Sequence, residues 1–205
     1  MDQNIIQLPP GISHQYLLNG NDGYLLIDTD IPNNYAHLLD SLDQVRVRLE
    51  SILMVVITHA DLDHYGCLNQ LKQQSPALVG AASQKEADAM RLGVGSRDFA
   101  RGVFTSANPL HTQIDRILTA GEKLPYLGGL EILSTPGHTP DHISLWSEST
   151  RTLFCGDSIK MTDGVPSPSS GIHNWDVELS LQSFEKQMAL QPDRIFAGHG
   201  TWQRE

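Results

Sequence analysis

Residues 58–66 read THADLDHYG, and this stretch decides how the rest of the chain is interpreted. Within six residues it carries four potential metal ligands: His59, Asp61, Asp63 and His64. Imidazole nitrogens and carboxylate oxygens together suit zinc, iron or manganese. The preceding apolar run, ILMVVI at 52–57, predicts a strand buried on both faces of a sheet. The alternative is that Asp61 or Asp63 only caps the following helix, because aspartate is a favoured N-cap residue.

Three later segments also place a ligand-type residue at the end of a predicted strand. They read TPGHTP at 135–140, FCGD at 154–157 and AGHG at 197–200, which singles out His138, Asp157 and His199. Glycine and proline flank these residues and allow the chain to turn sharply. Because α/β folds build their sites at the carboxyl ends of strands, we expect the four segments to meet in one crevice.

Helical and strand patterns alternate along the chain without a linker, which predicts one layered α/β domain over residues 1–205. Apolar spacing predicts helices over 33–45, 64–74, 84–92 and from 177 onward, the last with Asp176 as its N-cap. Short apolar runs predict strands at 15–18, 24–28, 51–58, 77–82, 130–134, 142–146, 152–155 and 194–197. Residues 164–171, with two Pro and three Ser, predict a loop, and 93–119 predict an insertion of loop and short helix.

The order of these motifs resembles the metallo-β-lactamase superfamily of metal-dependent hydrolases. The resemblance rests on the cluster at 59–64, then PGHT, GD and GHG, and it extends to the strand at 24–29, so it covers nearly the whole chain. It implies a four-layered αβ/βα sandwich with the metals in a groove at one edge of two sheets.

The resemblance also implies roles for individual residues. His59 and His138 would hold a first metal, Asp63, His64 and His199 a second, and Asp157 would bridge both. A water or hydroxide between the metals would be the nucleophile, since metal binding lowers its pKa towards ~7, and Asp63 would also orient it. Asp28 would fix a ligand imidazole by a hydrogen bond, unless it is only a turn residue.

Asp61 departs from the usual HxHxDH pattern, in which its position carries histidine. As a seventh ligand, its negative charge would favour iron or manganese relative to the all-histidine site, although zinc remains the favoured ion for one or two positions. Alternatively, Asp61 binds poorly and only the second metal loads well. Some relatives with a carboxylate there are flavodiiron oxidoreductases or nuclease-like domains. The leading expectation is a hydrolase of a small ester, thioester, lactone, amide or phosphoester. The alternative is an iron-dependent oxidoreductase of the flavodiiron or persulfide-dioxygenase type, or a nuclease-like phosphodiesterase.

Composition limits the partners. The net charge is −10 without a basic run, which disfavours nucleic acid. The start lacks a secretory signal, no apolar run is long enough to cross a membrane, and only two cysteines are present, so the expectation is a cytoplasmic enzyme with a small-molecule substrate. A homodimer is left open. Substrate selectivity is expected to come from residues 93–119 and 163–175.

Overall fold

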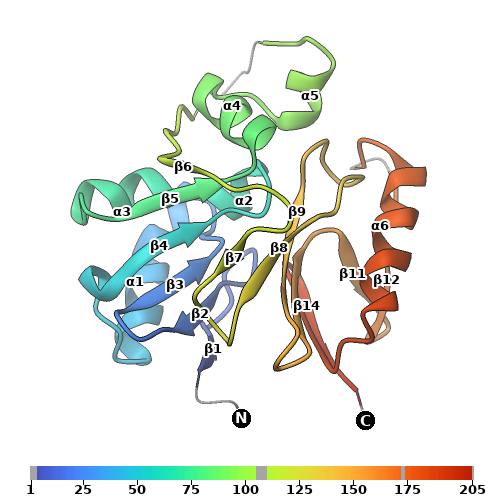
Figure 1. The fold of residues 1–205 in the computed structure, drawn as a ribbon. Coiled ribbons are helices and arrows are strands. Elements are labelled where there is room, and N and C mark those ends of the chain that lie inside the picture. Colours follow the sequence, from blue (N-terminus) through green and yellow to red (C-terminus); the bar gives the residue numbers. More distant parts are fainter. Residues whose placement is uncertain (1–3, 105–109, 172–173, 205) are drawn as a thin grey trace.

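The structure is a computed structural model that describes residues 4–104, 110–171 and 174–204. Residues 105–109 and 172–173, which belong to the two segments expected to set selectivity, lie outside the described residues. Two six-stranded sheets face each other and carry helices on their outer sides (Figure 1). The expected four-layered αβ/βα sandwich is therefore confirmed.

The first sheet comes from the N-terminal half and has the order β1-β2-β3-β4-β5-β6. Its antiparallel part joins β2 to both β1 and β3, and β3 to β6 run parallel. The strands are β1 (Ile5–Gln7), β2 (Tyr16–Asn19), β3 (Tyr24–Ile27), β4 (Ile52–Val56), β5 (Val79–Ala82) and β6 (Arg116–Ile117). Parallel pairing on both sides of β4 explains its continuous apolar sequence, although Leu53 is 41% exposed at its beginning.

The second sheet comes from the C-terminal half and has the order β14-β13-β10-β9-β8-β7. Among its described strands only β10 and β13 pair in parallel, which sends residues 157 and 198 to the same edge. The strands are β7 (Lys123–Leu124), β8 (Leu130–Ser134), β9 (Ile143–Ser147), β10 (Thr152–Gly156), β13 (Arg194–Ala197) and β14 (Gly200–Gln203).

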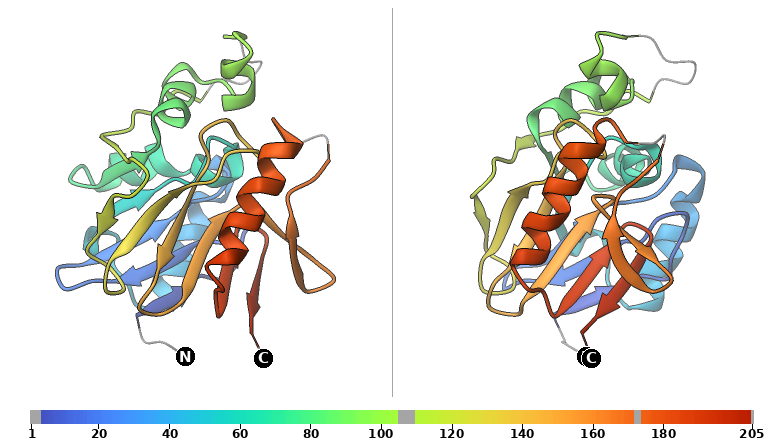
Figure 2. Two further views of the ribbon diagram at one scale, coloured as in Figure 1. Left: turned by 45° about the vertical axis from the view of Figure 1, so that its right-hand side comes forward. Right: turned by 90° about the vertical axis from the view of Figure 1, so that its right-hand side faces the viewer.

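The helices lie on the outer faces of the two sheets. On the first sheet they are α1 (Tyr35–Gln44), α2 (Leu62–Tyr65), α3 (Leu68–Gln74) and α4 (Gln84–Leu92), with short 3₁₀ turns at Pro32–Asn34 and Leu49–Ser51. Helix α6 (Val177–Ala189) lies across the second sheet, as both views in Figure 2 show. Asp176 caps α6 by accepting a hydrogen bond from the Leu179 N–H at 3.0 Å, as predicted.

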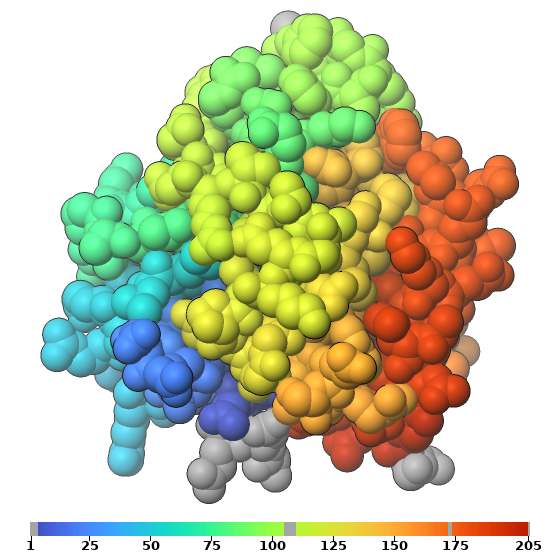
Figure 3. Space-filling model, in the orientation of Figure 1, coloured from blue at the N-terminus to red at the C-terminus, as the bar shows by residue number. Residues whose placement is uncertain are grey.

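Three apolar layers correspond to this arrangement. One lies between the first sheet and its helices and includes Leu38 and Leu71. The second, with Leu25 and Leu145, fills the space between the sheets, and the third packs Ile195 with Phe184 of α6. Figure 3 shows α4 and α5 (Ser96–Ala100) together at one end of the molecule. Within the described residues no helix is both long and apolar enough to cross a membrane.

The predicted helix over 64–74 is interrupted. The Thr29 N–H and hydroxyl donate to the His64 carbonyl, at 2.7 and 3.1 Å, and the Cys67 N–H donates to the Asp30 carbonyl at 3.0 Å. Backbone groups that would continue one helix are thus bonded to residues 29–30, and the segment divides into α2 and α3. This anchoring holds the turn that carries the ligand cluster against the first sheet.

The prediction of a loop over 164–171 was wrong. Residues Val165–Pro168 form β12, which pairs with β11 (Ile159–Thr162) in a separate two-stranded hairpin. Proline is tolerated there because β12 is an edge strand, where a missing N–H disrupts no further ladder. The hairpin forms a wall beside the site described below.

Candidate metal centre

The sequence-predicted residues come together at one edge of the two sheets. His59 follows β4, Asp63 and His64 lie on α2, and His138 lies in the turn between β8 and β9. Asp157 follows β10 and His199 lies between β13 and β14. Among the described residues they form two groups, each with ligand atoms within 4.8 Å of one another: His59, His138 and Asp157, called here the first metal group, and Asp63, His64 and His199, called the second.

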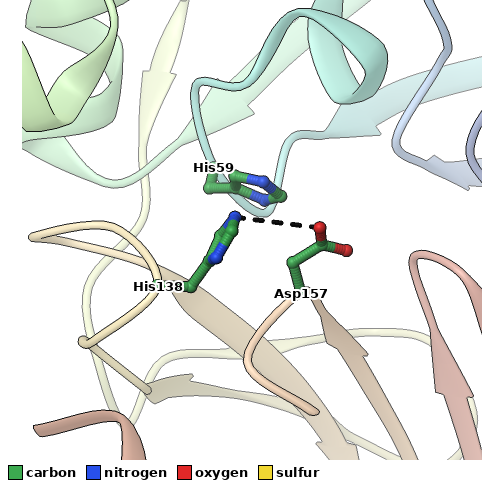
Figure 4. Close-up of side chains that lie close together, drawn as sticks. All are labelled: His59, His138 and Asp157. Atoms are coloured by element: carbon green, nitrogen blue, oxygen red, sulfur yellow. Dashed lines mark ion pairs between the residues drawn. The ribbon is translucent and has the colours of Figure 1, made fainter. Parts of the chain in front are cut away.

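The first metal group is formed by side chains from three different loops. Figure 4 shows His59, His138 and Asp157 pointing toward a common centre. The His138 Nε2 lies 3.7 Å from Asp157 Oδ2, and the His59 and His138 rings meet edge to face at 4.9 Å between centroids. His59 is fully buried and His138 nearly so, and burial lowers the pKa of His138, which favours the neutral imidazole.

The second metal group lies beside the first, and Asp157 of the first group also faces both histidines of the second. Asp63 Oδ2 is 3.6 Å from His64 Nε2 and 3.3 Å from His199 Nε2. Asp157 presents Oδ1 to His64 Nε2 at 3.5 Å and Oδ2 to His199 Nε2 at 3.4 Å. Since Oδ2 also faces His138, the Asp157 carboxylate lies between the two groups, in the position expected of a bridging ligand.

These groups fit metal ions. Metal–ligand bonds of about 2.0–2.1 Å in a tetrahedral site separate neighbouring ligand atoms by roughly 3.3 Å, close to the distances above. Moreover, the buried Nε2 atoms of His59 and His64 have no hydrogen-bond partner among the described residues. A buried polar atom without a partner is costly, so two of them directed at carboxylates indicate that an ion completes the site.

Hydrogen bonds behind the imidazoles fix their orientation. Asp28 Oδ2 accepts from His64 Nδ1 at 2.8 Å, which leaves Nε2 for an ion. The same carboxylate accepts from the Thr58 N–H and hydroxyl, both at 2.8 Å. His138 Nδ1 lies 3.3 Å from the Asn174 side-chain oxygen. Asp28 therefore takes the supporting position that the resemblance implies, and its φ of 57° shows that it is a turn residue as well.

His142, for which packing within the strand at 142–146 was favoured over a place at the site, contacts His59 and Asp157 of the first metal group. Its ring stacks on His59 at 5.0 Å, and its Nε2 accepts the Asp157 N–H at 3.2 Å. Its Nδ1 therefore carries the proton and donates to the Thr135 hydroxyl at 2.9 Å, and burial keeps its pKa well below the usual range. The chain of hydroxyls continues through Ser144 to the Gln187 side chain, all of it buried.

Gly198, the first glycine of the GHG motif, lies so close to the site that a side chain at this position would collide with it. A Cβ at Gly198 would lie 2.2 Å from Asp157 Oδ1 and 2.5 Å from His64 Cε1. Any larger residue would therefore displace one member of each metal group. This is a physical reason for the small residue that the sequence places beside His199.

Asp61 is held differently from the other candidate ligands. Arg97 of α5 binds both of its oxygens, Nη1 to Oδ1 at 2.5 Å and Nη2 to Oδ2 at 2.6 Å. Burial alone would raise the pKa of Asp61, but the hydrogen bonds from Arg97 and His138 hold it well below its usual range. Asp61 Oδ2 lies 3.1 Å from His138 Nε2 and 3.5 Å from His59 Nε2, yet Asp61 belongs to neither metal group. Arg97 lies in the segment 93–119 that was expected to set selectivity, but nothing in the sequence linked it to Asp61.

Carboxylates surround the two histidines of the second metal group and favour a positive charge there. Burial opposes the charged form of His64, but Asp157 and Asp28 together raise its pKa to about 10. Hydrogen bonds to Asp157 and Asp63 raise the pKa of His199 to about 10 as well. In the metal-free chain these imidazoles thus carry protons that a metal ion would displace.

A cavity of about 420 Å³ opens above the two groups. Its floor is polar and its wall comes partly from the β11–β12 hairpin; the lining residues are Asp61, Asp63, His138, Asp157, Ile159, Lys160, Met161, Ser169 and His199. Ser169 comes from the expected selectivity segment 163–175, whereas Trp175 does not line this cavity. The Trp175 N–H instead donates to the carbonyls of Gly137 and His138 and fixes their turn. Tyr65, next to the cluster, is buried in the core.

Comparison with known proteins agrees with this geometry. The sequence matches the metallo-beta-lactamase superfamily over residues 8–199. It is 27% identical to the uncharacterized protein YobT of Bacillus subtilis over 92% of this chain and 83% of that protein. It is 31% identical to the beta-lactamase-like protein 2 homolog of Drosophila melanogaster, covering 92% of this chain but 59% of the relative. A hydroxyacylglutathione hydrolase of Klebsiella pneumoniae is 28% identical over 94% of this chain and 63% of its own length.

Solved structures share the fold at lower identity. A metallo-beta-lactamase family protein from Thermus thermophilus superposes with a TM-score of 0.71 at 21% identity, over 98% of this chain and 75% of that one. A subclass B3 metallo-beta-lactamase of Bradyrhizobium japonicum gives a TM-score of 0.69 at 19% identity, over 96% of this chain and 75% of that one. With the motifs, the sandwich and the match along almost its whole length, this chain belongs to the metallo-beta-lactamase superfamily.

Proposed function

We propose that this protein is a metal-dependent hydrolase that acts on a small ester, thioester, lactone, amide or phosphoester. The observation that carries the proposal is the convergence of two metal groups on the floor of a cavity, with the buried Nε2 atoms of His59 and His64 directed into them. One or two divalent ions would bind there, with zinc as the favoured ion because the donors are imidazole and carboxylate.

When bound, such ions polarise the substrate carbonyl or phosphoryl group and lower the pKa of a water molecule to about 7. The chain's own residues would hold and orient the reactants. Asp63 lines the cavity and is a quarter exposed, so its carboxylate can accept a hydrogen bond from the attacking water. Asp157, whose N–H donates to His142 Nε2, would present its carboxylate to both groups.

The cavity sets the size of the substrate. A volume of about 420 Å³ suits a small molecule. Ile159 and Met161 supply an apolar wall, the exposed Lys160 supplies a charge, and the buried Ser169 hydroxyl lies 3.4 Å from His138 Nδ1. A compact acyl, lactone or phosphoryl group with a modest apolar substituent fits this combination.

The names of the relatives support hydrolysis. One is called a hydroxyacylglutathione hydrolase and another, YflN of Bacillus subtilis, a probable metallo-hydrolase that is 26% identical over 86% of this chain. The oxidoreductase and nuclease alternatives drew on Asp61 as an additional ligand. In the structure Arg97 binds both oxygens of that carboxylate. Asp61 is therefore already paired with an arginine, which weakens the argument for these two alternatives.

The test is turnover by the purified, zinc-loaded protein on a panel of carboxylic esters, thioesters, lactones and phosphoesters. We expect at least one class to be hydrolysed, with the activity lost in Asp157→Ala and His138→Ala. Asp43→Asn, which changes an exposed carboxylate on α1, is the matched control and should retain full activity. Unchanged turnover in the Asp157 or His138 variant would refute the assignment.

A further inference from the structure

The guanidinium of Arg97 lies at the first metal group and not at the second. Its bidentate bonds to Asp61 place Nη2 3.4 Å from His138 Nε2, which is also 3.1 Å from Asp61 Oδ2. The pair is mostly buried, with 17% of the Arg97 side chain and 24% of the Asp61 side chain exposed. A ligand atom of the first metal group is therefore already in contact with a fixed ion pair.

The second metal group has a different kind of counter-charge. Its ion pairs join Asp63 and Asp157 to His64 and His199, at 3.3 to 3.6 Å. Two carboxylates, those of Asp63 and Asp157, therefore face the second metal group and can attract a cation. Arginine cannot be deprotonated in a protein, so the charge at the first metal group persists.

Asp61 Oδ2 lies nearer to His138 Nε2 than Arg97 does, at 3.1 against 3.4 Å, and the charge of Arg97 offsets the attraction that this carboxylate would have for a divalent ion. Even in a medium close to water, a unit charge at this range changes the affinity by roughly ten-fold or more. Arg97 also draws on the lone pairs of Asp61, which reduces what that carboxylate can offer to an ion.

We propose that Arg97 makes the two metal groups unequal, so that the chain fills the second group first and the first group only at a higher metal concentration. The inference rests on the proposed metal centre and goes beyond it by assigning the difference between the groups to one residue. It turns the Asp61–Arg97 pair into a determinant of metal occupancy.

The test is a competition titration of the metal-free protein with Zn²⁺ against a chromophoric chelator. Wild type should bind two ions in steps whose dissociation constants differ at least ten-fold, and His199→Ala should remove the tight step. Arg97→Met should tighten the weak step at least ten-fold and leave the tight step within about three-fold. Arg97→Lys keeps the charge and should leave the weak step weak. Arg91→Met, on the exposed side of α4, is the control and should match wild type.

Loss of the arginine leaves a buried carboxylate, so each variant is first checked by urea unfolding. If Arg97→Met does not fold, Arg97→Gln replaces it, because an amide can still donate to Asp61 without a charge. Two steps of equal affinity in wild type, or a weak step that neither neutral variant tightens, would overturn this inference and leave the proposed function standing. Failure of every protein to bind zinc would overturn both.

Discussion

Asp28→Asn separates the support of a ligand from the stability of the fold. Asp28 accepts three hydrogen bonds, from His64 Nδ1, the Thr58 N–H and the Thr58 hydroxyl, each at 2.8 Å. Asparagine offers one acceptor oxygen and an NH₂ group, so it cannot satisfy all three donors. If its NH₂ faces His64, the imidazole must accept at Nδ1, and the proton moves to Nε2, the atom directed at the metal group.

The size of the effect follows from this switch. Replacement of a residue that orients a metal-bound histidine typically costs 10–100-fold in metal affinity, which is about 1.4–2.7 kcal/mol. We expect that loss in the tight zinc step, measured by chelator competition. The free energy of unfolding should also fall, by about 1–3 kcal/mol for a buried donor left without its partner.

Asp30→Asn is the matched control. Asp30 is as buried as Asp28, lies two residues away, and also accepts three hydrogen bonds, from the Ile12 N–H, the Ile31 N–H and the Asn34 amide. None of these partners belongs to a metal group. Asp30→Asn should therefore lower stability and leave zinc affinity unchanged. Equal zinc affinity in Asp28→Asn and Asp30→Asn would refute the reasoning.

Three further predictions concern the site. The nearby carboxylates raise the pKa of His64, against the opposing effect of burial, and that of His199 to about 10. Zinc loading at pH 8 should therefore release close to two protons, one from each histidine. Calorimetry in buffers of different ionisation enthalpy counts these protons. The raised pKa values mean that the protonated histidines stabilise the metal-free fold fully below pH 6.5, their ordinary pKa, and that this stabilisation is lost as the pH rises towards 10. The urea midpoint of the metal-free protein should therefore fall over that pH range. The midpoint of a His199→Ala variant should change less. Gly198→Ala, whose Cβ would collide with Asp157 and His64, should abolish tight zinc binding, whereas Gly95→Ala, whose Cβ would meet nothing nearer than Asp98 Oδ2 at 4.0 Å, should not.

The candidate ligands could be found from the sequence because His138, Asp157 and His199 each follow a short apolar run and are flanked by glycine or proline, and because the dense cluster at 59–64 follows the apolar run at 52–57. Such local signals place His138, Asp157 and His199 at strand ends, and the parallel order of β10 and β13 then brings the last two to one edge. The four layers followed from the alternation of helical and strand patterns together with the resemblance. The chemistry was thus predictable where neighbouring residues alone determine it.

Other features depend on contacts between distant segments and could not be predicted. Arg97 is 36 residues from Asp61 and lies on a five-residue helix without apolar periodicity, so no local pattern connects them. The break between α2 and α3 comes from hydrogen bonds to residues 29–30. The strand β12 contains Pro166 and Pro168, which argue against a strand except at an edge, and its edge position is known only from the structure.

The proton on His142 likewise follows from tertiary contacts. Its sequence position, after a proline and an aspartate, indicates only the start of a strand. The structure shows that Nε2 accepts from Asp157 and Nδ1 donates to Thr135, which defines the tautomer. His142 is therefore part of the support for the metal centre, a role that strand periodicity does not reveal.

Metal content tests the central claim most directly. Elemental analysis of the purified protein, alongside its optical spectrum, should give one to two divalent ions per chain, and the paired variant His64→Ala with His138→Ala, which removes one imidazole from each group, should carry none. Zinc without visible absorption agrees with the proposed hydrolase, whereas iron with redox-sensitive absorption would favour the oxidoreductase alternative. A wild-type protein that holds no metal even after reconstitution, or a paired variant that holds as much as wild type, would contradict the assignment of this site.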